Sequence, residues 1–334
     1  MDRVTKEFLK ELVLKGIIVG FSEKRIYVES EENVKAALAA VRSFGLGDVY
    51  KEKDVAVIGK VRALGTQENF RTRKWRPLMM GISVGHREIT AGTLGGFASK
   101  DGEKYIISNA HVLHPWPFMV QAPYTKRIWQ PGPYDTKWDY EHETDYWVAD
   151  YAYHVRIHSM YEYPECPVSR AVNTVYRALG RKSRVRALQV PNYVDLAVAR
   201  VLEGVGIVNN TYAYAVEKNA GFDASRLTFI GNLFAGSSAG HAVICKTAKY
   251  WKQYFAGYDL MFPSTQAEVA PGQRLKKDGR TSGATVGTVW DESASLAVGY
   301  WLDVAWFEDV VLTHEDMGAK GGDSGSPVFL AEPL

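Results

Sequence analysis

A serine flanked by glycines is the feature of this sequence that most directly suggests chemistry. Residues Lys320 to Phe329 read Lys-Gly-Gly-Asp-Ser-Gly-Ser-Pro-Val-Phe, which places Ser324 between two glycine-containing turns. Glycine lets the backbone turn sharply, so the N–H groups of Gly322 and Ser324 can point at one spot. Two such donors form an oxyanion hole, which stabilises the charge that develops during acyl transfer. The pattern predicts a nucleophilic serine; the alternative is a turn that merely contains these residues.

A serine hydroxyl becomes a good nucleophile only when a base removes its proton, and the usual base is a histidine oriented by a carboxylate. His111 ends the β-rich run that begins at Tyr105, whereas the other seven of the eight histidines lie in polar or aromatic contexts. Asp195 stands directly before the apolar run Leu196 to Val201. We therefore predict a catalytic triad of His111, Asp195 and Ser324, in that chain order.

Several further segments support one interpretation of this order. They are Thr93–Phe97, Ser108–His111, Gln130–Asp135, Val194–Ala197, Gly279–Gly283 and Gly322–Ser326. Because a Ser-His-Asp triad occurs on unrelated folds in different chain orders, the order His, Asp, Ser discriminates between those folds. With these segments, the chain resembles the chymotrypsin/trypsin-like serine peptidases, especially bacterial and archaeal forms without disulfides. The resemblance implies a mainly β protein with a chymotrypsin-like double β-barrel. It also implies hydrolysis of a polypeptide substrate through an acyl-enzyme, with no metal or organic cofactor.

The resemblance also assigns a role to Arg280. In animal relatives an N-terminus freed by cleavage pairs with the aspartate beside the nucleophile, whereas bacterial relatives use a buried arginine in the segment that matches Gly279–Gly283. We therefore expect Arg280 to pair with Asp323 and to hold the oxyanion loop, because a buried carboxylate without a partner would be costly. The alternative is a surface arginine in a glycine turn.

One departure from the family concerns the second barrel. The sequence ends at Leu334, soon after Ser324, whereas in the family further strands follow the nucleophile. Residues 227–237 and 241–246 resemble those strands but precede the Gly279 segment. Our hypothesis is a second barrel rearranged in chain order, closed by residues 227–262. An inserted hairpin is the alternative.

The same resemblance predicts where a substrate would bind. Phe234, Ala235 and Gly236 would form the edge that pairs with an extended substrate backbone. Gly318 and Ala319, just before the nucleophile, would line the specificity pocket. Because a glycine stands where trypsins carry an aspartate, a preference for basic residues is not supported, unless Asp316 reaches into the pocket.

Composition limits the other classes of function. A net charge of +2 over 334 residues argues against a general polyanion binder. We find no secretory signal and no apolar run long enough to span a membrane, so we expect a cytoplasmic or virion-associated protein without a membrane partner. The two cysteines, Cys166 and Cys245, form no disulfide framework, although a single bridge stays open. Low Asn and Gln content with many Tyr and Trp is typical of a thermophile.

The pattern along the chain predicts four regions. Residues 1–65 read as a small α+β domain, with helices near 4–15 and 31–43 and strands at 16–19, 25–29 and 55–61. Residues 66–80 read as a linker, 81–200 as the first barrel with an aromatic-rich insertion at 114–190, and 201–334 as the second barrel. The N-terminal domain could be a pro-segment that assists folding or blocks the cleft, a docking module, or a packing appendage.

Two other functions remain open at this stage. The chain could be a catalytically silent, protease-like binding or structural module, for example of a virus particle. It could also bind nucleic acid through the basic residues between Arg170 and Arg186, on a helix at about 168–179, although a solvated helix face is the favoured interpretation of that run. A metal site at His142, His154 and His158 is not favoured, because no tight ligand spacing supports it.

Overall fold

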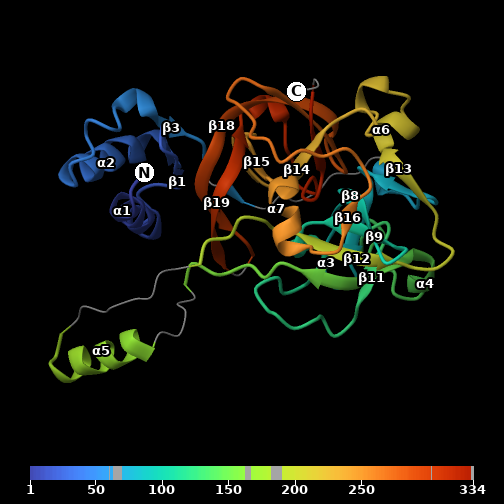
Figure 1. Ribbon diagram of the computed structural model, residues 1–334, viewed down its shortest axis with the longest axis horizontal. Coiled ribbons are helices and arrows are strands. Elements are labelled where there is room, and N and C mark those ends of the chain that lie inside the picture. The colour runs from blue at the N-terminus through green and yellow to red at the C-terminus, as the bar shows by residue number, and fades with distance from the viewer. Residues whose placement is uncertain (60, 63–69, 162–166, 182–189, 302, 332–334) are drawn as a thin grey trace.

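The computed structural model describes residues 1–59, 61–62, 70–161, 167–181, 190–301 and 303–331 (Figure 1). The protein is mainly β, with a chymotrypsin-like pair of β-barrels and a small N-terminal α+β domain, which confirms the expected fold class. The first barrel lies at the lower right of Figure 1 and the second at the upper centre. Within the described part of the chain, no helix is both long and apolar enough to cross a membrane.

The first barrel closes because two short strands act as one bent strand. β7 and β8 are separated only by Leu94 and Gly95, and they pair with β6 on one side and with β9 on the other. From β9 the ladder continues through β12, β11 and β10 and returns to β6. The strands are β6 (Ser83–His86), β7 (Gly92–Thr93), β8 (Gly96–Lys100), β9 (Glu103–Ser108), β10 (Arg127–Trp129), β11 (Trp147–His154) and β12 (Ala197–Val201). Closure leaves this barrel no long unpaired edge.

The second barrel is also a closed ring. Its ladder runs β17–β20–β14–β15–β19–β18, and β18 pairs again with β17. The strands are β14 (Phe229–Ser237), β15 (Ala242–Cys245), β17 (Arg274–Gly279), β18 (Gly283–Gly299), β19 (Val304–Thr313) and β20 (Pro327–Leu330). β18 is long enough to serve both neighbours, and register shifts against β19 near Asp291 and Ala294 mark the bulges that bend it.

The chain order of this ring is what the rearrangement hypothesis expects. β14 and β15 precede β17 in sequence, yet they lie between β20 and β19 in the ring. The remainder of residues 227–262 behaves differently: α7 (Thr247–Tyr254) follows β15, and β16 (Asp259–Leu260) pairs with β8 of the first barrel. The segment therefore both closes one barrel and contacts the other.

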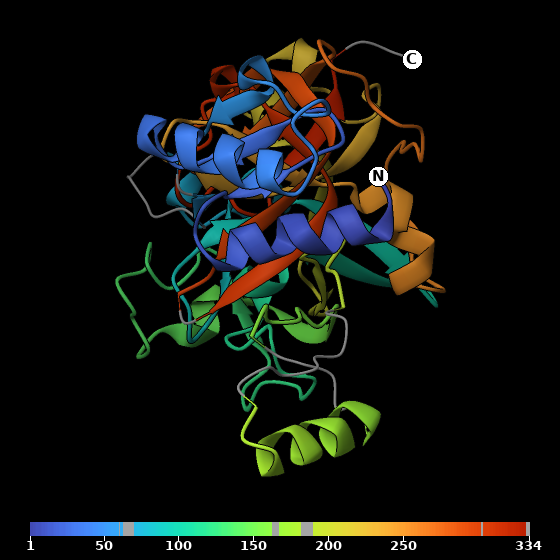
Figure 2. The ribbon, with the colours of Figure 1, turned by 90° about the vertical axis from the view of Figure 1, so that its left-hand side faces the viewer.

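The N-terminal domain is joined to the second barrel through backbone pairing. It contains α1 (Arg3–Leu14), β1 (Gly20–Phe21), β2 (Ile26–Val28), α2 (Glu31–Ser43), the 3₁₀ helix Glu52–Asp54, β3 (Val55–Val57) and β4 (Val61–Arg62). β1 pairs antiparallel with β18, so the small sheet β3–β2–β1 extends the sheet of the barrel. Trp306 of β19 belongs to the same apolar core as Leu9 and Phe21. In Figure 2 the two helices lie in front of the red strands of the second barrel.

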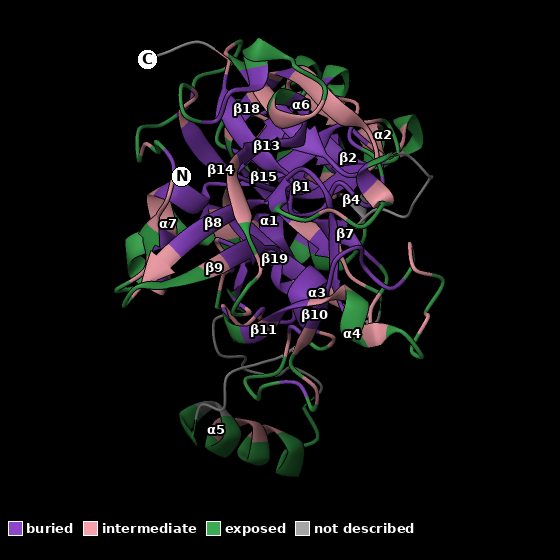
Figure 3. Ribbon diagram, turned by 90° about the vertical axis from the view of Figure 1, so that its right-hand side faces the viewer, coloured by how far each residue is buried: buried purple, intermediate pink, exposed green. Residues whose placement is uncertain are grey.

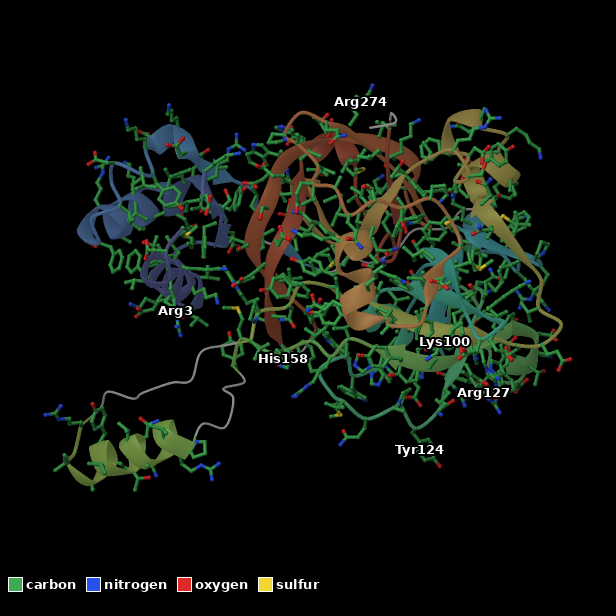
Figure 4. The ribbon with its side chains drawn as sticks, in the orientation of Figure 1. Arg3, Lys100, Tyr124, Arg127, His158 and Arg274 are labelled. Carbon is green, nitrogen blue, oxygen red and sulfur yellow. The ribbon has the colours of Figure 1, made fainter. Side chains whose placement is uncertain are left out.

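Between β11 and β12 the chain carries α5 (Pro167–Ala178), close to the helix expected at 168–179. On either side of this segment, His158 and Asn192 lie together, because the His158 amide donates to the Asn192 side chain at 2.7 Å, and the Asn192 amide donates to Trp306 at 3.0 Å. His158 marks that point in Figure 4, and Figure 3 shows α5 as an exposed helix apart from the buried strands.

Several boundaries differ from those predicted. The first strand is Gly20–Phe21 and not residues 16–19, because Ile17 and Ile18 donate back to Leu12 and cap α1. Residues 66–69 of the expected linker lie outside the described residues. The rest of it is built into the body, with a 3₁₀ helix at Phe70–Thr72 and β5 (Leu78–Met80), which pairs with β13 (Ile207–Thr211).

The aromatic-rich segment 114–190 is also more than an insertion, since it supplies two strands of the first barrel, β10 and β11, and the short helix α4 (Glu143–Tyr146). The remaining short elements are α3 (Ala110–Leu113), α6 (Tyr212–Ala215) and 3₁₀ helices at Ala220–Phe222 and Glu315–Met317.

Candidate active site

The structure brings His111 and Asp195 into direct contact. β9 ends at Ser108, and the chain turns at once into α3, which carries His111. Asp195 lies just before β12, the neighbour of β9 in the first barrel. The Nδ1 atom of His111 lies 2.5 Å from Oδ2 of Asp195, and the His111 backbone amide donates to Oδ1 at 3.2 Å. Since Nδ1 faces a carboxylate, it carries the proton, and Nε2 is left with a lone pair that can accept one.

Asp195 is fully buried and has a further hydrogen-bond donor that the sequence did not reveal. The hydroxyl of Tyr300, at the end of β18, donates to Oδ2 of Asp195 at 2.7 Å, and its ring lies edge-on to the His111 imidazole. Burial, followed by the nearby Asp195 charge, raises the pKa of Tyr300 well above its usual range, so this hydroxyl stays a donor. On the backbone, the Asn109 side chain donates to the Asp195 carbonyl at 2.7 Å.

Cys245 of β15 lies directly beside this carboxylate. The Asp195 amide donates to its sulfur at 3.3 Å. Cys245 is free and buried, and burial raises the pKa of its thiol well above the usual range. It is therefore a packing thiol. Cys166, the other cysteine, lies outside the described residues.

Ser324 lies in a loop that is clamped between the two barrels. Its carbonyl accepts from the Thr93 amide of β7 at 2.7 Å, and the next amide, that of Gly325, donates to Leu233 of β14 at 2.8 Å. A Cβ added to Gly92 would lie within 2.8 Å of both the Val112 side chain and the Ser324 carbonyl. One glycine thus separates the helix that carries His111 from the loop that carries Ser324.

The Ser324 hydroxyl donates to the Phe234 carbonyl at 3.3 Å in this structure. No hydrogen bond joins it to His111, whose Nε2 is unpaired among the described residues. A serine side chain moves between acceptors by rotation about one bond, and catalytic hydrogen bonds often form only with substrate present.

The backbone N–H groups of Gly322 and Ser324 are free to donate. Gly322 has a φ of 86° and Gly325 a φ of 98°, conformations that favour glycine. Of the described residues, none accepts a hydrogen bond from the Gly322 or the Ser324 amide, whereas the Gly322 carbonyl is fixed by the Thr93 hydroxyl at 2.7 Å. A side chain at Gly325 would collide with the Thr93 carbonyl at 2.1 Å, so this close approach requires glycine. Two unpaired amides beside a serine can stabilise an oxyanion.

We expected Arg280 to form an ion pair with Asp323, but in the structure the cation beside Asp323 is Lys277. Asp323 lies 3.3 Å from the ammonium of Lys277, and it accepts from the amides of Thr281 and Ser282, each at 3.0 Å. Burial alone would raise the pKa of Asp323, but the Lys277 charge and the Ser282 hydrogen bonds outweigh it and lower this pKa.

Arg280 is buried as predicted, but its guanidinium pairs with Asp135, to which Nε donates at 2.7 Å. The physical reason lies in the strand geometry. Lys277, on β17, is fully buried and reaches the carboxylate from inside the barrel, whereas Arg280 lies in the turn after β17 and reaches the segment Gln130–Asp135 of the first barrel. Asp135 lies in the segment Gln130–Asp135, which already supported the resemblance to the serine peptidases, so the sequence did offer a signal for this residue.

The predicted substrate-binding residues divide into two groups. Phe234, Ala235 and Gly236 lie on β14 next to Ser324, and all three are buried. Gly318 has open space where a side chain would be, but Ala319 packs into the apolar core of the second barrel. Ala319 therefore does not line an open pocket, because its methyl group faces the barrel interior.

No group of three or more His, Cys, Asp and Glu side chains suited to a metal ion occurs in the described part of the chain. His142 is exposed and lies 3.0 Å from Asp139, and His154 is buried against the Tyr151 hydroxyl at 2.7 Å.

Comparisons with known proteins support the fold and nothing finer. No protein-family model matches the sequence. A search of curated proteins also finds no match. Solved structures that are similar in fold include three serine proteases. A glutamic acid-specific serine protease, described as using a novel histidine triad in substrate binding, has a TM-score of 0.33 and 12% identity over 76% of this chain and 92% of its own.

The second, a Cellulomonas bogoriensis chymotrypsin, has a TM-score of 0.34 and 11% identity, covering 76% of this chain and 77% of its own. The third, Thermobifida fusca protease A, has a TM-score of 0.32 and 10% identity, covering 76% and 90%. At this level the likeness carries no inference about chemistry.

Proposed function

We propose that this chain is a serine endopeptidase that hydrolyses peptide bonds through an acyl-enzyme. The observation that carries the proposal is the buried Asp195 held against Nδ1 of His111 at 2.5 Å, in a site where Ser324 stands beside two unpaired amides. A carboxylate–imidazole pair next to a serine and an oxyanion site is the arrangement that acyl transfer requires.

Each group has a role in the proposed reaction. The Ser324 oxygen attacks the scissile carbonyl while Nε2 of His111 takes the hydroxyl proton, and the carbonyl electrons move onto oxygen. The amides of Gly322 and Ser324 stabilise that oxyanion. His111 then gives the proton to the leaving amine, and an ester to Ser324 remains. Water repeats the sequence through His111, which regenerates the serine hydroxyl and releases the acid. Asp195 orients the imidazole and stabilises its charged form.

The test is covalent labelling with a fluorophosphonate, which reacts with an activated serine. We expect modification of Ser324, located by mass spectrometry of the digested protein, and loss of labelling in Ser324→Ala. In His111→Ala, labelling should slow by several powers of ten, because triad members act as a unit. His142→Ala is the matched control, since His142 also pairs with an aspartate, Asp139, but in an exposed position. Absence of labelling in the unaltered protein would favour the catalytically silent module.

A further inference from the structure

A backbone slot lies beside the nucleophile, between β14 and β18. Along the edge of β14 that faces away from β15, β20 pairs with Phe229 and Gly231, and the Ser324 hydroxyl reaches the Phe234 carbonyl. The next positions on the same edge, Gly236 and Ser237, pair with a different strand. The far wall of the slot is Gly299, the last residue of β18.

The strand in this slot is β4, which the chain supplies from its own N-terminal part. Arg62 lies opposite Gly236 and Val61 opposite Ser237, in antiparallel register. Arg62 also pairs with Gly299 on the other side. β4 is therefore bound on both of its backbone edges, although it is only two residues long.

The residues before β4 anchor it to the body. Ile58 is fully buried and belongs to the large core that both barrels share. Gly59 follows with a φ of 71°, and a Cβ there would lie 2.5 Å from the Ser238 hydroxyl, at the end of β14. The chain thus crosses from β3 of the N-terminal domain onto the rim of the second barrel before it enters the slot.

The direction of β4 brings its backbone towards Ser324. Because β4 is antiparallel to β14, the step from Val61 to Arg62 moves from Ser237 to Gly236, towards Phe234 and Ser324. An extended polypeptide that presents a carbonyl to Ser324 by adding a strand to β14 needs the same backbone groups. β4 and such a polypeptide cannot occupy Gly236 and Ser237 together.

We propose that the slot between β14 and β18 is a docking surface for an extended polypeptide, and that β4 fills it in cis and restrains hydrolysis. The inference rests on the proposed function and adds a regulatory role for the N-terminal domain. Small substrates that do not reach Gly236 are not subject to this restraint. If β4 occupies the slot most of the time, the apparent affinity for a polypeptide falls by the fraction of molecules in which the slot is open.

The full-length double variant Val61→Pro/Arg62→Pro tests this directly, because proline cannot donate a ladder hydrogen bond. Glu52→Pro is the matched control: it puts a proline in the same domain at the first position of a 3₁₀ helix, where Lys51 before it is already extended. Fluorescein-labelled β-casein reports polypeptide hydrolysis, and the rate of fluorophosphonate labelling reports the reactivity of Ser324.

We expect casein hydrolysis by the double variant to rise about tenfold or more, with a change in labelling rate of less than about threefold. The control should match the unaltered protein in both assays. If the unaltered protein is labelled at Ser324 and already cleaves casein as fast as the double variant, the slot inference is wrong and the peptidase stands. If Ser324 is labelled in no variant, the proposed function itself fails.

A second variant keeps the inference testable if the double variant misfolds. Gly59→Val changes the residue that anchors β4 and keeps the sequence of β4 itself. A branched side chain at a φ of 71° is strained and would also press on Ser238, so it should loosen the anchor. If the double variant loses the near-ultraviolet circular dichroism of the native protein, Gly59→Val must reproduce the rise in casein hydrolysis for the inference to survive.

Discussion

Removal of the Tyr300 hydroxyl is the sharpest test of how Asp195 is held. Tyr300→Phe keeps the ring that lies edge-on to His111, with centroids 5.6 Å apart, and deletes only the 2.7 Å hydrogen bond to Oδ2 of Asp195. The carboxylate keeps its contacts with the His111 ring and amide. The variant therefore isolates one donor among three.

The expected size of the effect follows from the type of bond. A hydrogen bond to a charged group contributes about 1.5–3 kcal/mol, and about 1.4 kcal/mol corresponds to a tenfold change in rate. If the whole energy of this hydrogen bond stabilises the transition state, its loss lowers kcat/KM by roughly tenfold to a hundredfold. The loss should appear in kcat with KM nearly unchanged, because Tyr300 acts through Asp195 on a group that becomes charged only during reaction.

Steady-state kinetics on a peptide ester substrate measure this split. Tyr254→Phe is the control, since the Tyr254 ring packs near Tyr250 and its hydroxyl makes no hydrogen bond among the described residues. A thermal unfolding curve shows whether either variant is destabilised. If Tyr300→Phe keeps more than half of the original kcat/KM while Ser324 remains reactive, the Tyr300 hydrogen bond does not position Asp195 for catalysis.

Two further predictions concern buried charges. Lys277→Met should lower the free energy of unfolding by about 3 kcal/mol and slow labelling of Ser324, because it leaves the buried Asp323 carboxylate without its cationic partner. Lys276→Met, on the outer face of the same strand, is the control and should change the free energy of unfolding little. Urea unfolding compares the two variants, and equal losses would refute the role of Lys277. Burial lowers the pKa of His86 from 6.5 to about 4, so the unfolded chain binds its proton first and stability should fall as the pH drops from 6.5 towards 4, by at most about 3 kcal/mol. His86→Gln should flatten that part of the stability profile measured by urea unfolding at pH 7 and 4.5, and an unchanged slope would contradict the assignment.

The sequence was most informative where chemistry restricts residue type. His111, Asp195 and Ser324 were proposed as a triad because a nucleophile, a base and a carboxylate each favour particular neighbours. Of these three residues, the structure places His111 against Asp195. Pairings that depend on which side of a strand a charge occupies were not predictable in the same way. Lys277 and Arg280 are cations close to each other in sequence, and Lys277 points at Asp323 because it lies on β17, whereas Arg280 lies in the turn after that strand.

Some contacts between distant segments left no sequence signal. Tyr300 reaches Asp195 because it follows the last residue of the long strand β18, beside His111, and nothing in its local sequence marks it. The closing of the second barrel by β14 and β15 could be predicted because their sequence resembled missing strands. The presence of β4 in the slot could not, since two residues carry no periodicity.

These separate contacts converge on β18. Near its far end the N-terminal domain is paired to it, with Phe21 opposite Ser295 and Gly20 opposite Leu296. A few residues later Gly299 pairs with Arg62 of β4, and the next residue, Tyr300, donates to Asp195. β4 and Tyr300 therefore lie at the same end of β18. Residues 1–62 therefore contact the active-site region both through the slot beside Ser324 and through the strand that positions Tyr300, which argues against their being a packing appendage and favours a role in control of the site.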